Sequence, residues 1–235
     1  MLEDLKKSFI KEAEKSFAEI CKKAVDIGKS FEEIKNGKGE ISLKVYKGDK
    51  VEKVIFSSIK IFELAVVEES FMVWPTDEYN FPVLWCNLTS MSGMNIAICD
   101  YMPLADLTIW SDYISKYFEG FQRIKREVMK ELKNGIEEEL NEISSIVICA
   151  LSPYRIILNL KDEGVDRFIF QLKKFYSDYL SLINSSKNID GDDKDFSIRK
   201  KEALKKLMKQ NDPGYPIMAN AFGNELTDKV FDIIF

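Results

Sequence analysis

Asp212 is the residue whose setting most directly suggests chemistry. It lies in the stretch KQNDPGYPIMANAFG, between a basic segment and a pair of prolines. A carboxyl group half-buried against apolar surface keeps its proton near neutral pH, because desolvation raises its pKa, and it can then act as a general acid. Asp-Pro-Gly is also ordinary turn chemistry, in which the aspartate caps the chain and Pro-Gly reverses it. The residues alone leave both interpretations open.

The composition limits which groups can move protons. The chain contains no histidine, which excludes Ser-His-Asp and Cys-His triads and His-ligated metals or haem. The 11 glycines form no GxGxxG or P-loop pattern, so we expect no nucleotide cofactor. The four cysteines lack CxxC spacing and are expected to be buried core thiols of a reducing compartment. Carboxyl groups with shifted pKa values, Lys, Tyr, Cys or the substrate itself must therefore handle protons.

A basic segment, IRKKEALKKLMKQ, directly precedes Asp212. Its cationic residues are Arg199, Lys200, Lys201, Lys205, Lys206 and Lys209, against the single acid Glu202. Such a run is either a solvated helix face or a docking surface for an acidic partner. The chain as a whole has a net charge of only -5 and 46% apolar residues, so the composition indicates no nucleic-acid or membrane partner.

The elements that must position these residues follow from changes in apolar period. Helical spacing over residues 2–24 predicts an N-terminal helix that ends near Gly28, and alternation over residues 40–104 predicts a meander of antiparallel strands. Helical spacing returns over 107–143, a last strand is expected within 144–160, and helices are expected over 165–183 and 196–209, separated by a polar loop at 184–195. This order predicts one mixed α/β domain over residues 1–235, a three-layer α/β/α sandwich with a central antiparallel sheet.

Within the predicted meander, VVEESFMVWP carries the most informative alternation. Strand periodicity places Glu68, Ser70, Met72 and Trp74 on one face and Glu69 on the other. If the first face lines a pocket, the pocket acquires a carboxyl and a hydroxyl group. Charged strand residues more often remain in water, so a solvated Glu68 is the alternative.

Three separated stretches resemble the ferredoxin-dependent bilin reductase family. They are PTDEYNFPVLWCNL, AICDYMPL and the C-terminal NDPGYPIMANAFGNELTDKVFDIIF. They occur in the family's order, between about Ile59 and Phe235. Within the family, Asn87 together with DPGYP is most similar to the plant phytochromobilin synthases.

This resemblance implies a linear tetrapyrrole held between the sheet and the C-terminal helices. The expected reaction reduces biliverdin IXα or a dihydrobiliverdin to a phytobilin, by single electrons from reduced ferredoxin, each followed by a proton. No metal or flavin of the enzyme's own is implied. Asp212 matches the family's C-terminal carboxylate and is the expected proton donor. Asn87 is expected to bind and orient the tetrapyrrole, because an amide hydrogen-bonds but is not an acid; a strand-end asparagine that satisfies backbone groups is the alternative.

The sequence departs from the family pattern at Ser70. Phytochromobilin synthases carry Asp at this position and other relatives carry His, so one usual proton donor is missing. Glu68 can replace that acid if its face lines the pocket, and Glu63 in FELAVV matches a pocket Glu of some relatives if a shorter hairpin is allowed. The expected substrate-binding set is Ser70, Glu68, Glu63, Met72 and Asn211.

The resemblance also implies that the basic segment binds ferredoxin, because ferredoxins are strongly acidic. The expected docking residues are Arg199, Lys201, Lys205, Lys206 and Lys209. Two alternatives stay open: a tetrapyrrole-binding protein that lost catalysis along with the acid at position 70, and a reductase of a chlorophyll catabolite. We expect a monomer in a bacterial or virus-infected cytoplasm or in an organellar stroma.

Overall fold

A nine-stranded antiparallel sheet forms the centre of the computed structural model, which describes residues 2–140 and 145–235. The strands are β1 (Lys23–Ala24), β2 (Glu33–Asn36), β3 (Gly39–Lys47), β4 (Val51–Ile61), β5 (Val66–Pro75), β6 (Val83–Met91), β7 (Met94–Met102), β8 (Ile136–Glu139) and β9 (Ile156–Leu160). Their order is β1-β3-β4-β5-β6-β7-β9-β8, with β2 also paired to β3. The predicted meander therefore corresponds to β3–β7.

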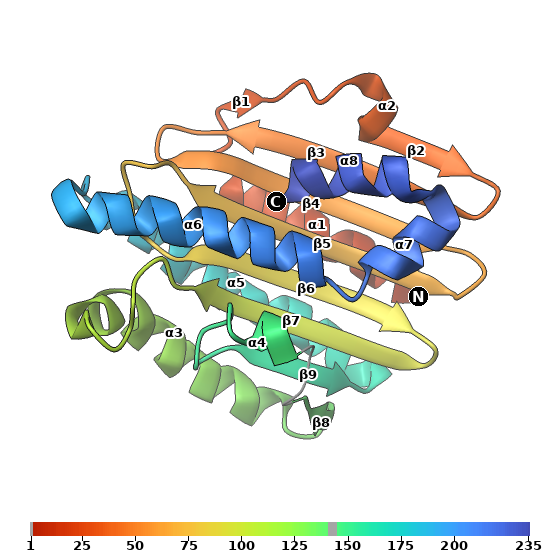
Figure 1. The fold of residues 1–235 in the computed structure, drawn as a ribbon. Helices are drawn as coiled ribbons and strands as arrows, with labels where there is room; N and C mark the ends of the chain where they lie inside the picture. The colour runs from red at the N-terminus through yellow and green to blue at the C-terminus, as the bar shows by residue number, and fades with distance from the viewer. Residues whose placement is uncertain (1, 141–144) are drawn as a thin grey trace.

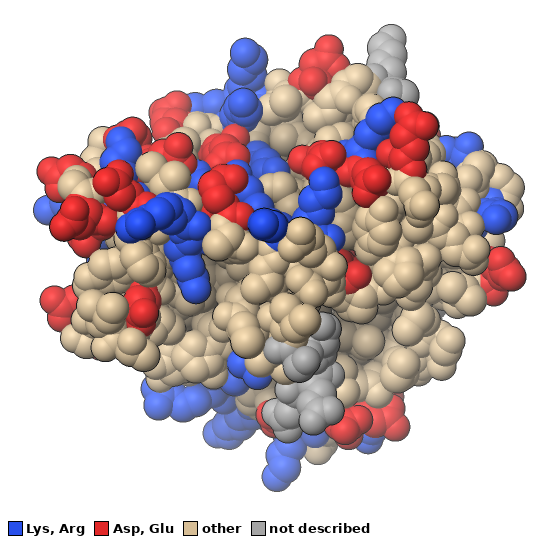
Figure 2. All heavy atoms as spheres, in the orientation of Figure 1, with Lys and Arg blue, Asp and Glu red and all other residues tan. Residues whose placement is uncertain are grey.

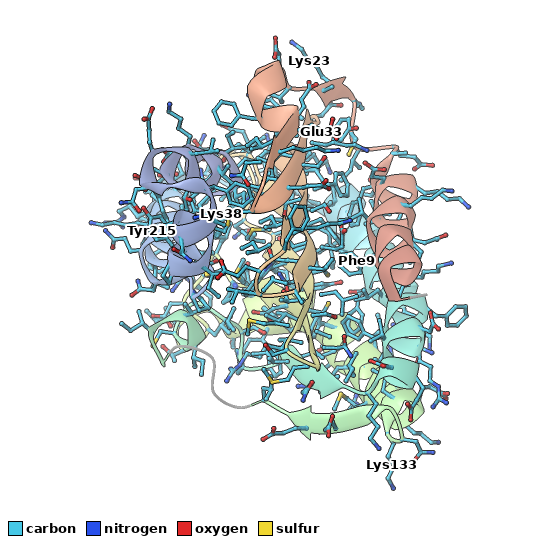
Figure 3. The ribbon with its side chains drawn as sticks, turned by 90° about the vertical axis from the view of Figure 1, so that its right-hand side faces the viewer. Phe9, Lys23, Glu33, Lys38, Lys133 and Tyr215 are labelled. Carbon is cyan, nitrogen blue, oxygen red and sulfur yellow. The ribbon has the colours of Figure 1, made fainter. Side chains whose placement is uncertain are left out.

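Helices cover both faces of this sheet and complete the predicted three-layer sandwich (Figure 1). They are α1 (Leu2–Phe17), α2 (Lys29–Glu32), α3 (Ser111–Leu132), α4 (Ser145–Ile148), α5 (Asp162–Ser185), α6 (Gly191–Asn211), α7 (Tyr215–Phe222) and α8 (Asn224–Ile234). In Figure 1, α4, α6, α7 and α8 lie in front of the sheet and α1, α3 and α5 behind it. The edge-on view in Figure 3 separates Tyr215 of α7 from Phe9 of α1 by the sheet.

The rear layer is held by a large aromatic core. Phe9 and Phe17 of α1 pack on Phe71 of β5, with ring centroids 5.7 and 5.6 Å apart, and Tyr176 of α5 meets Phe71 edge-on at 5.2 Å. The Tyr179 hydroxyl donates a hydrogen bond to the Pro82 carbonyl at 2.6 Å, which satisfies its polar atom inside the core. This layer fixes the sheet from behind and leaves the front face to other elements.

A tight hairpin sets the register of β6 against β7. Ser92 and Gly93, which join β6 to β7, both adopt positive φ, 51° and 84°, as in the turn that matches the twist of a two-residue hairpin. Alternation then keeps one set of side chains on the front face along each strand. In the pairing of β5 with β6, which residues 76–82 connect, Ser70 stands opposite Asn87, and two residues away Glu68 stands opposite Thr89.

The predicted helices are present, but several of them begin or end at other residues than the sequence predicts. The first helix ends at Phe17 and not near Gly28, because the chain then turns and Lys23–Ala24 pair with β3. Helix α3 ends at Leu132 and not near residue 143; the chain turns at Gly135, whose backbone lies so close to Gly164 that a Cβ there would come within 2.6 Å of the Gly164 Cα. The predicted loop 184–195 is partly wrong, since α6 already begins at Gly191.

The cysteines follow the prediction only in part. Cys86 and Cys99 are buried neighbours on β6 and β7, with their sulfur atoms 3.5 Å apart. Cys21 is half-buried and Cys149 is exposed, contrary to a core role for all four. All four are free thiols.

Candidate active site

A cavity of about 380 Å³ lies between the front face of the sheet and the C-terminal helices, within the size range of small-molecule sites. Its floor comes from β4–β7 and includes Ile59, Met72, Trp85, Ile96 and Ile98; its opposite wall includes Met208, Ile217, Met218, Phe231 and Phe235 of α6, α7, α8 and the C-terminus. These surfaces make the cavity predominantly apolar. No Lys or Arg is among the described residues that line the cavity.

Polar side chains form a compact group on the apolar floor. The Ser70 and Ser57 hydroxyl oxygens lie 2.6 Å apart across β5 and β4. The Thr89 hydroxyl lies 2.9 Å from Asn87 Oδ1 and 3.4 Å from Glu68 Oε2. Strand pairing brings these five residues together from β4, β5 and β6.

Asp212 reaches the cavity from the end of α6. It is the C-cap of that helix, and its backbone N–H donates to the Met208 carbonyl at 3.0 Å. Its Oδ1 accepts a hydrogen bond of 2.7 Å from the Gly214 N–H. Pro213 cannot continue the helical hydrogen bonding, so the chain turns here and α7 begins at Tyr215. Asp212 is thus a turn residue and a cavity residue at the same time.

Burial raises the pKa of the Asp212 carboxyl above its ordinary value, and the Gly214 N–H opposes that shift. Burial also raises the pKa of Glu68, to about 7, with a further increase from the nearby charge of Asp212. Hydrogen bonds from Asn87 and Thr89 act in the opposite direction. The cavity therefore holds two carboxyl groups with raised pKa values, and each shift is toward the protonated state that a proton donor needs.

The structure brings most of the predicted substrate residues to this cavity. Glu68, Ser70, Met72, Asn87 and Asp212 all line it. Glu69 points to the other face of the sheet, as the alternation predicts, and its Oε1 accepts a hydrogen bond of 2.8 Å from Ser58.

Two predicted substrate residues lie elsewhere. Strand β4 runs to Ile61 and β5 begins at Val66, so Glu63 stands in the exposed turn between them and does not line the cavity. The Asn211 amide donates to the Leu207 carbonyl at 2.9 Å, and Asn211 is also absent from the cavity lining. The geometry supports neither as a substrate contact.

The basic segment does not form a uniformly basic surface. Lys201 is only 3% exposed, and its Nζ lies 2.8 Å from Glu52 Oε2 and 3.2 Å from the Pro75 carbonyl, with Asp77 also bound. Lys205 pairs with Glu52 and Glu202 at 3.0 and 3.1 Å, and Lys209 pairs with Asp232. Figure 2 shows positive and negative side chains intermingled over this part of the front face. Arg199 and Lys206 remain exposed. Lys201 is therefore a structural residue and not a docking one.

Apart from Met72, sequence reasoning overlooked the apolar side chains that line the cavity, and it also overlooked two polar residues of the site. Thr89 and Trp85 line the cavity, and Ser57 lies behind Ser70. Alternation from Asn87 would have placed Trp85 and Thr89 on the same face. Ser57 had no comparable signal, because its role depends on the pairing of β4 with β5.

The described residues contain no group of three or more His, Cys, Asp or Glu side chains placed to hold a metal ion. Over the same ranges, no helix has the length and apolar character needed to cross a membrane.

A model of the family described as ferredoxin-dependent bilin reductase matches residues 9–234. The chain belongs to the ferredoxin-dependent bilin reductase family. The chain is similar to phycoerythrobilin:ferredoxin oxidoreductases of Prochlorococcus marinus. It is 23% identical to that of strain MIT 9215 over 167 residues, which cover 68% of this chain and 63% of the relative. It is 21% identical to that of strain MIT 9301 over 169 residues, covering 69% and 64%.

The match therefore spans less than two thirds of either curated relative's length. Among solved structures, the tomato phytochromobilin synthase in complex with biliverdin has the same fold, with a TM-score of 0.79 and 17% identity over 98% of this chain and 81% of the tomato chain. The expected family and sandwich architecture are confirmed.

Proposed function

We propose that this protein reduces a linear tetrapyrrole in the cavity between the sheet and α6–α8, with electrons from ferredoxin. The observation that carries the proposal is Asp212, a carboxyl group with a raised pKa on the wall of an apolar cavity. Reduction of one double bond consumes two electrons and two protons. Ferredoxin supplies the electrons one at a time, and the protein has to supply the protons to carbon atoms.

The cavity suits biliverdin or a dihydrobiliverdin for two reasons. Its apolar floor and roof can cover both faces of a conjugated chain, and Asn87 and Ser70 offer groups that hydrogen-bond pyrrole N–H groups or lactam oxygens. Without Lys or Arg among the described lining residues, the propionates of a bound bilin have to point toward solvent, since buried carboxylates need a partner.

Arg199 and Lys206 are the docking residues we propose for ferredoxin. Both are exposed on α6, whose other end carries the cavity residues Met208 and Asp212. An acidic partner on α6 would thus lie on the same side of the sheet as the bilin. Of the five residues expected to dock ferredoxin, Arg199 and Lys206 are the two whose side chains are exposed.

A non-catalytic tetrapyrrole-binding protein remains the second candidate. It is favoured by Ser70, which offers no acid and whose hydroxyl already lies 2.6 Å from that of Ser57.

Absorbance spectroscopy separates these functions. Biliverdin should show a spectral shift on mixing with the protein, and a second change to a reduced bilin should require reduced ferredoxin. Oxidised ferredoxin is the matched control and should cause no second change. A shift on mixing without ferredoxin-dependent turnover would support the binding protein, and no shift at all would contradict both.

A further inference from the structure

Glu68 is the second acid of the cavity, and the sequence pattern of the family does not account for it. It lies on β5, two residues before Ser70, on the sheet side of the cavity, whereas Asp212 comes from the end of α6 on the helix side. A ligand in the cavity would therefore have a carboxyl group on each side.

Hydrogen bonds hold the Glu68 carboxyl group in place beside the polar group of the cavity floor. Thr89 and Asn87 both donate toward it, and the Thr89 hydroxyl oxygen lies 3.4 Å from Glu68 Oε2. These hydrogen bonds lower the pKa of Glu68 and so oppose the effect of burial, which is the larger of the two. The carboxyl group is therefore fixed in position on the sheet side of the cavity.

The surrounding charges favour the protonated form of Glu68. The charged groups that act on Glu68 are Asp212, across the cavity, and Glu69, its neighbour on β5; both are acids. No Lys or Arg is among the described residues that line the cavity with it. Burial and these two acids raise the pKa of Glu68 to about 7, although the residue keeps partial access to the cavity.

We infer that Glu68 is a second proton donor of this site, so that Glu68 and Asp212 each deliver one of the two protons consumed when a double bond of the bilin is reduced. The inference rests on the proposed function. Two reduced ferredoxins give one electron each and become oxidised. The π bond of one double bond is lost and two new bonds to hydrogen form. Each carboxyl becomes a carboxylate and regains its proton from water.

This assignment explains how the site can work with serine at position 70. The acid that Ser70 lacks is present two residues earlier on the same strand and on the same face. Because strand residues at i and i+2 share a face, moving the acid by two positions keeps it in the cavity.

The test compares Glu68→Gln, Glu68→Asp and the control Glu63→Gln in single-turnover reduction of biliverdin by reduced ferredoxin. Glu63→Gln makes the same chemical change in the β4–β5 turn, outside the cavity, and should behave like the parental protein. Glu68→Gln keeps the size of the side chain and should still bind biliverdin with the parental spectrum. Its product formation should fall by about a hundredfold to ten-thousandfold.

Glu68→Asp keeps an acid and should recover much of the lost rate. In the parental protein the rate should decline as pH rises through about 7, because Glu68 then begins as a carboxylate. A purely structural role for Glu68 would not produce that decline.

The outcomes separate the inference from the proposed function. A parental protein that does not reduce biliverdin would overturn both. If the parental protein is active, parental turnover in Glu68→Gln would overturn the role of Glu68 alone. Loss of biliverdin binding in Glu68→Gln would also overturn that role, because Glu68 would then act as a binding contact. Turnover in Glu68→Asp as slow as in Glu68→Gln would overturn it too, because the shape of the side chain and not its acidity would then matter.

Discussion

The two oxygen atoms of the Asp212 carboxyl have different surroundings. Oδ1 accepts the Gly214 N–H and closes the turn at the end of α6. Among the described residues, none donates a hydrogen bond to Oδ2. The same side chain can therefore hold the turn through one oxygen and carry a proton on the other.

Replacement of Asp212 by Asn tests this division at the level of the residue. The amide oxygen can still accept the Gly214 N–H, so Asp212→Asn should fold and bind biliverdin as before. Electrons from ferredoxin should still reach the bilin. Without the acidic proton, a one-electron-reduced radical should persist in the absorbance spectrum, and product should form about a hundredfold to ten-thousandfold more slowly.

Asp166, exposed on α5 behind the sheet, provides the matched control. Asp166→Asn should leave both binding and turnover unchanged. Parental turnover in Asp212→Asn, with the same product, would mean that the carboxyl is only a turn residue.

At the level of the element, α6 has an inner face that stabilises the fold and an outer face that remains free. Lys201 on the inner face holds Glu52 and Asp77, and the Nζ of Lys205 lies 5.6 Å from the centre of the Trp74 ring. Removing one partner of a buried ion pair typically lowers the free energy of unfolding by about 3–5 kcal/mol. A substitution at Lys201 would therefore destabilise the fold, and its effect on ferredoxin docking could not be measured separately. Arg199 and Lys206 avoid this difficulty because they are exposed.

Charge reversal on the outer face of α6 should therefore affect only the encounter with ferredoxin. Arg199→Glu combined with Lys206→Glu should slow ferredoxin-driven turnover on the order of tenfold at low ionic strength. The defect should shrink above about 0.1 M salt, where the Debye length is about 10 Å. Biliverdin binding, followed by absorbance, should stay at the parental level.

Lys133 is exposed at the end of α3, behind the sheet (Figure 3), and Lys133→Glu is the matched control. It should leave turnover unchanged at every salt concentration. An equal defect in both proteins would point to net charge as the cause. A defect that does not depend on salt would argue against docking through α6.

At the scale of the whole molecule, the buried acids link stability to pH. The pKa of Glu68 is about 7 in the folded chain, against 4.5 for an ordinary Glu, so the folded state binds this proton more tightly than the unfolded state. The stabilisation is complete below about pH 4.5 and is lost as pH rises through about 7. Burial also raises the pKa of Asp100, to about 6, opposed by hydrogen bonds from Ser152, and its contribution has the same sign.

Chemical denaturation at several pH values measures this linkage. Between pH 4.5 and pH 8, the parental free energy of unfolding should fall by about 3 kcal/mol more than that of Glu68→Gln, because the variant has no proton to lose at this position. Asp100 is present in both proteins, so its contribution cancels in the difference. Parallel pH profiles for the two proteins would show that Glu68 is an ordinary, ionised carboxylate in the fold.

Alternation and composition determined much of this protein without reference to its tertiary structure. The period of two in VVEESFMVWP placed Glu68, Ser70 and Met72 on one face and Glu69 on the other, because successive side chains of a strand point to opposite sides of a sheet. The absence of histidine restricted proton chemistry to groups such as carboxyls. These conclusions depend only on the covalent chain and on local backbone geometry.

Tertiary structure decided which of these side chains meet. Asp212 and Glu68 are far apart in sequence, and only the packing of α6 over β5 brings them to one cavity, where the charge of Asp212 adds to the effect of burial and raises the pKa of Glu68. The same packing buries Lys201 against Glu52, although its neighbours in the basic segment look alike in sequence. Local periodicity specifies a face within one element. The burial of the side chains on that face depends on which other element packs against it. Their pKa values and ion pairs depend on the same packing.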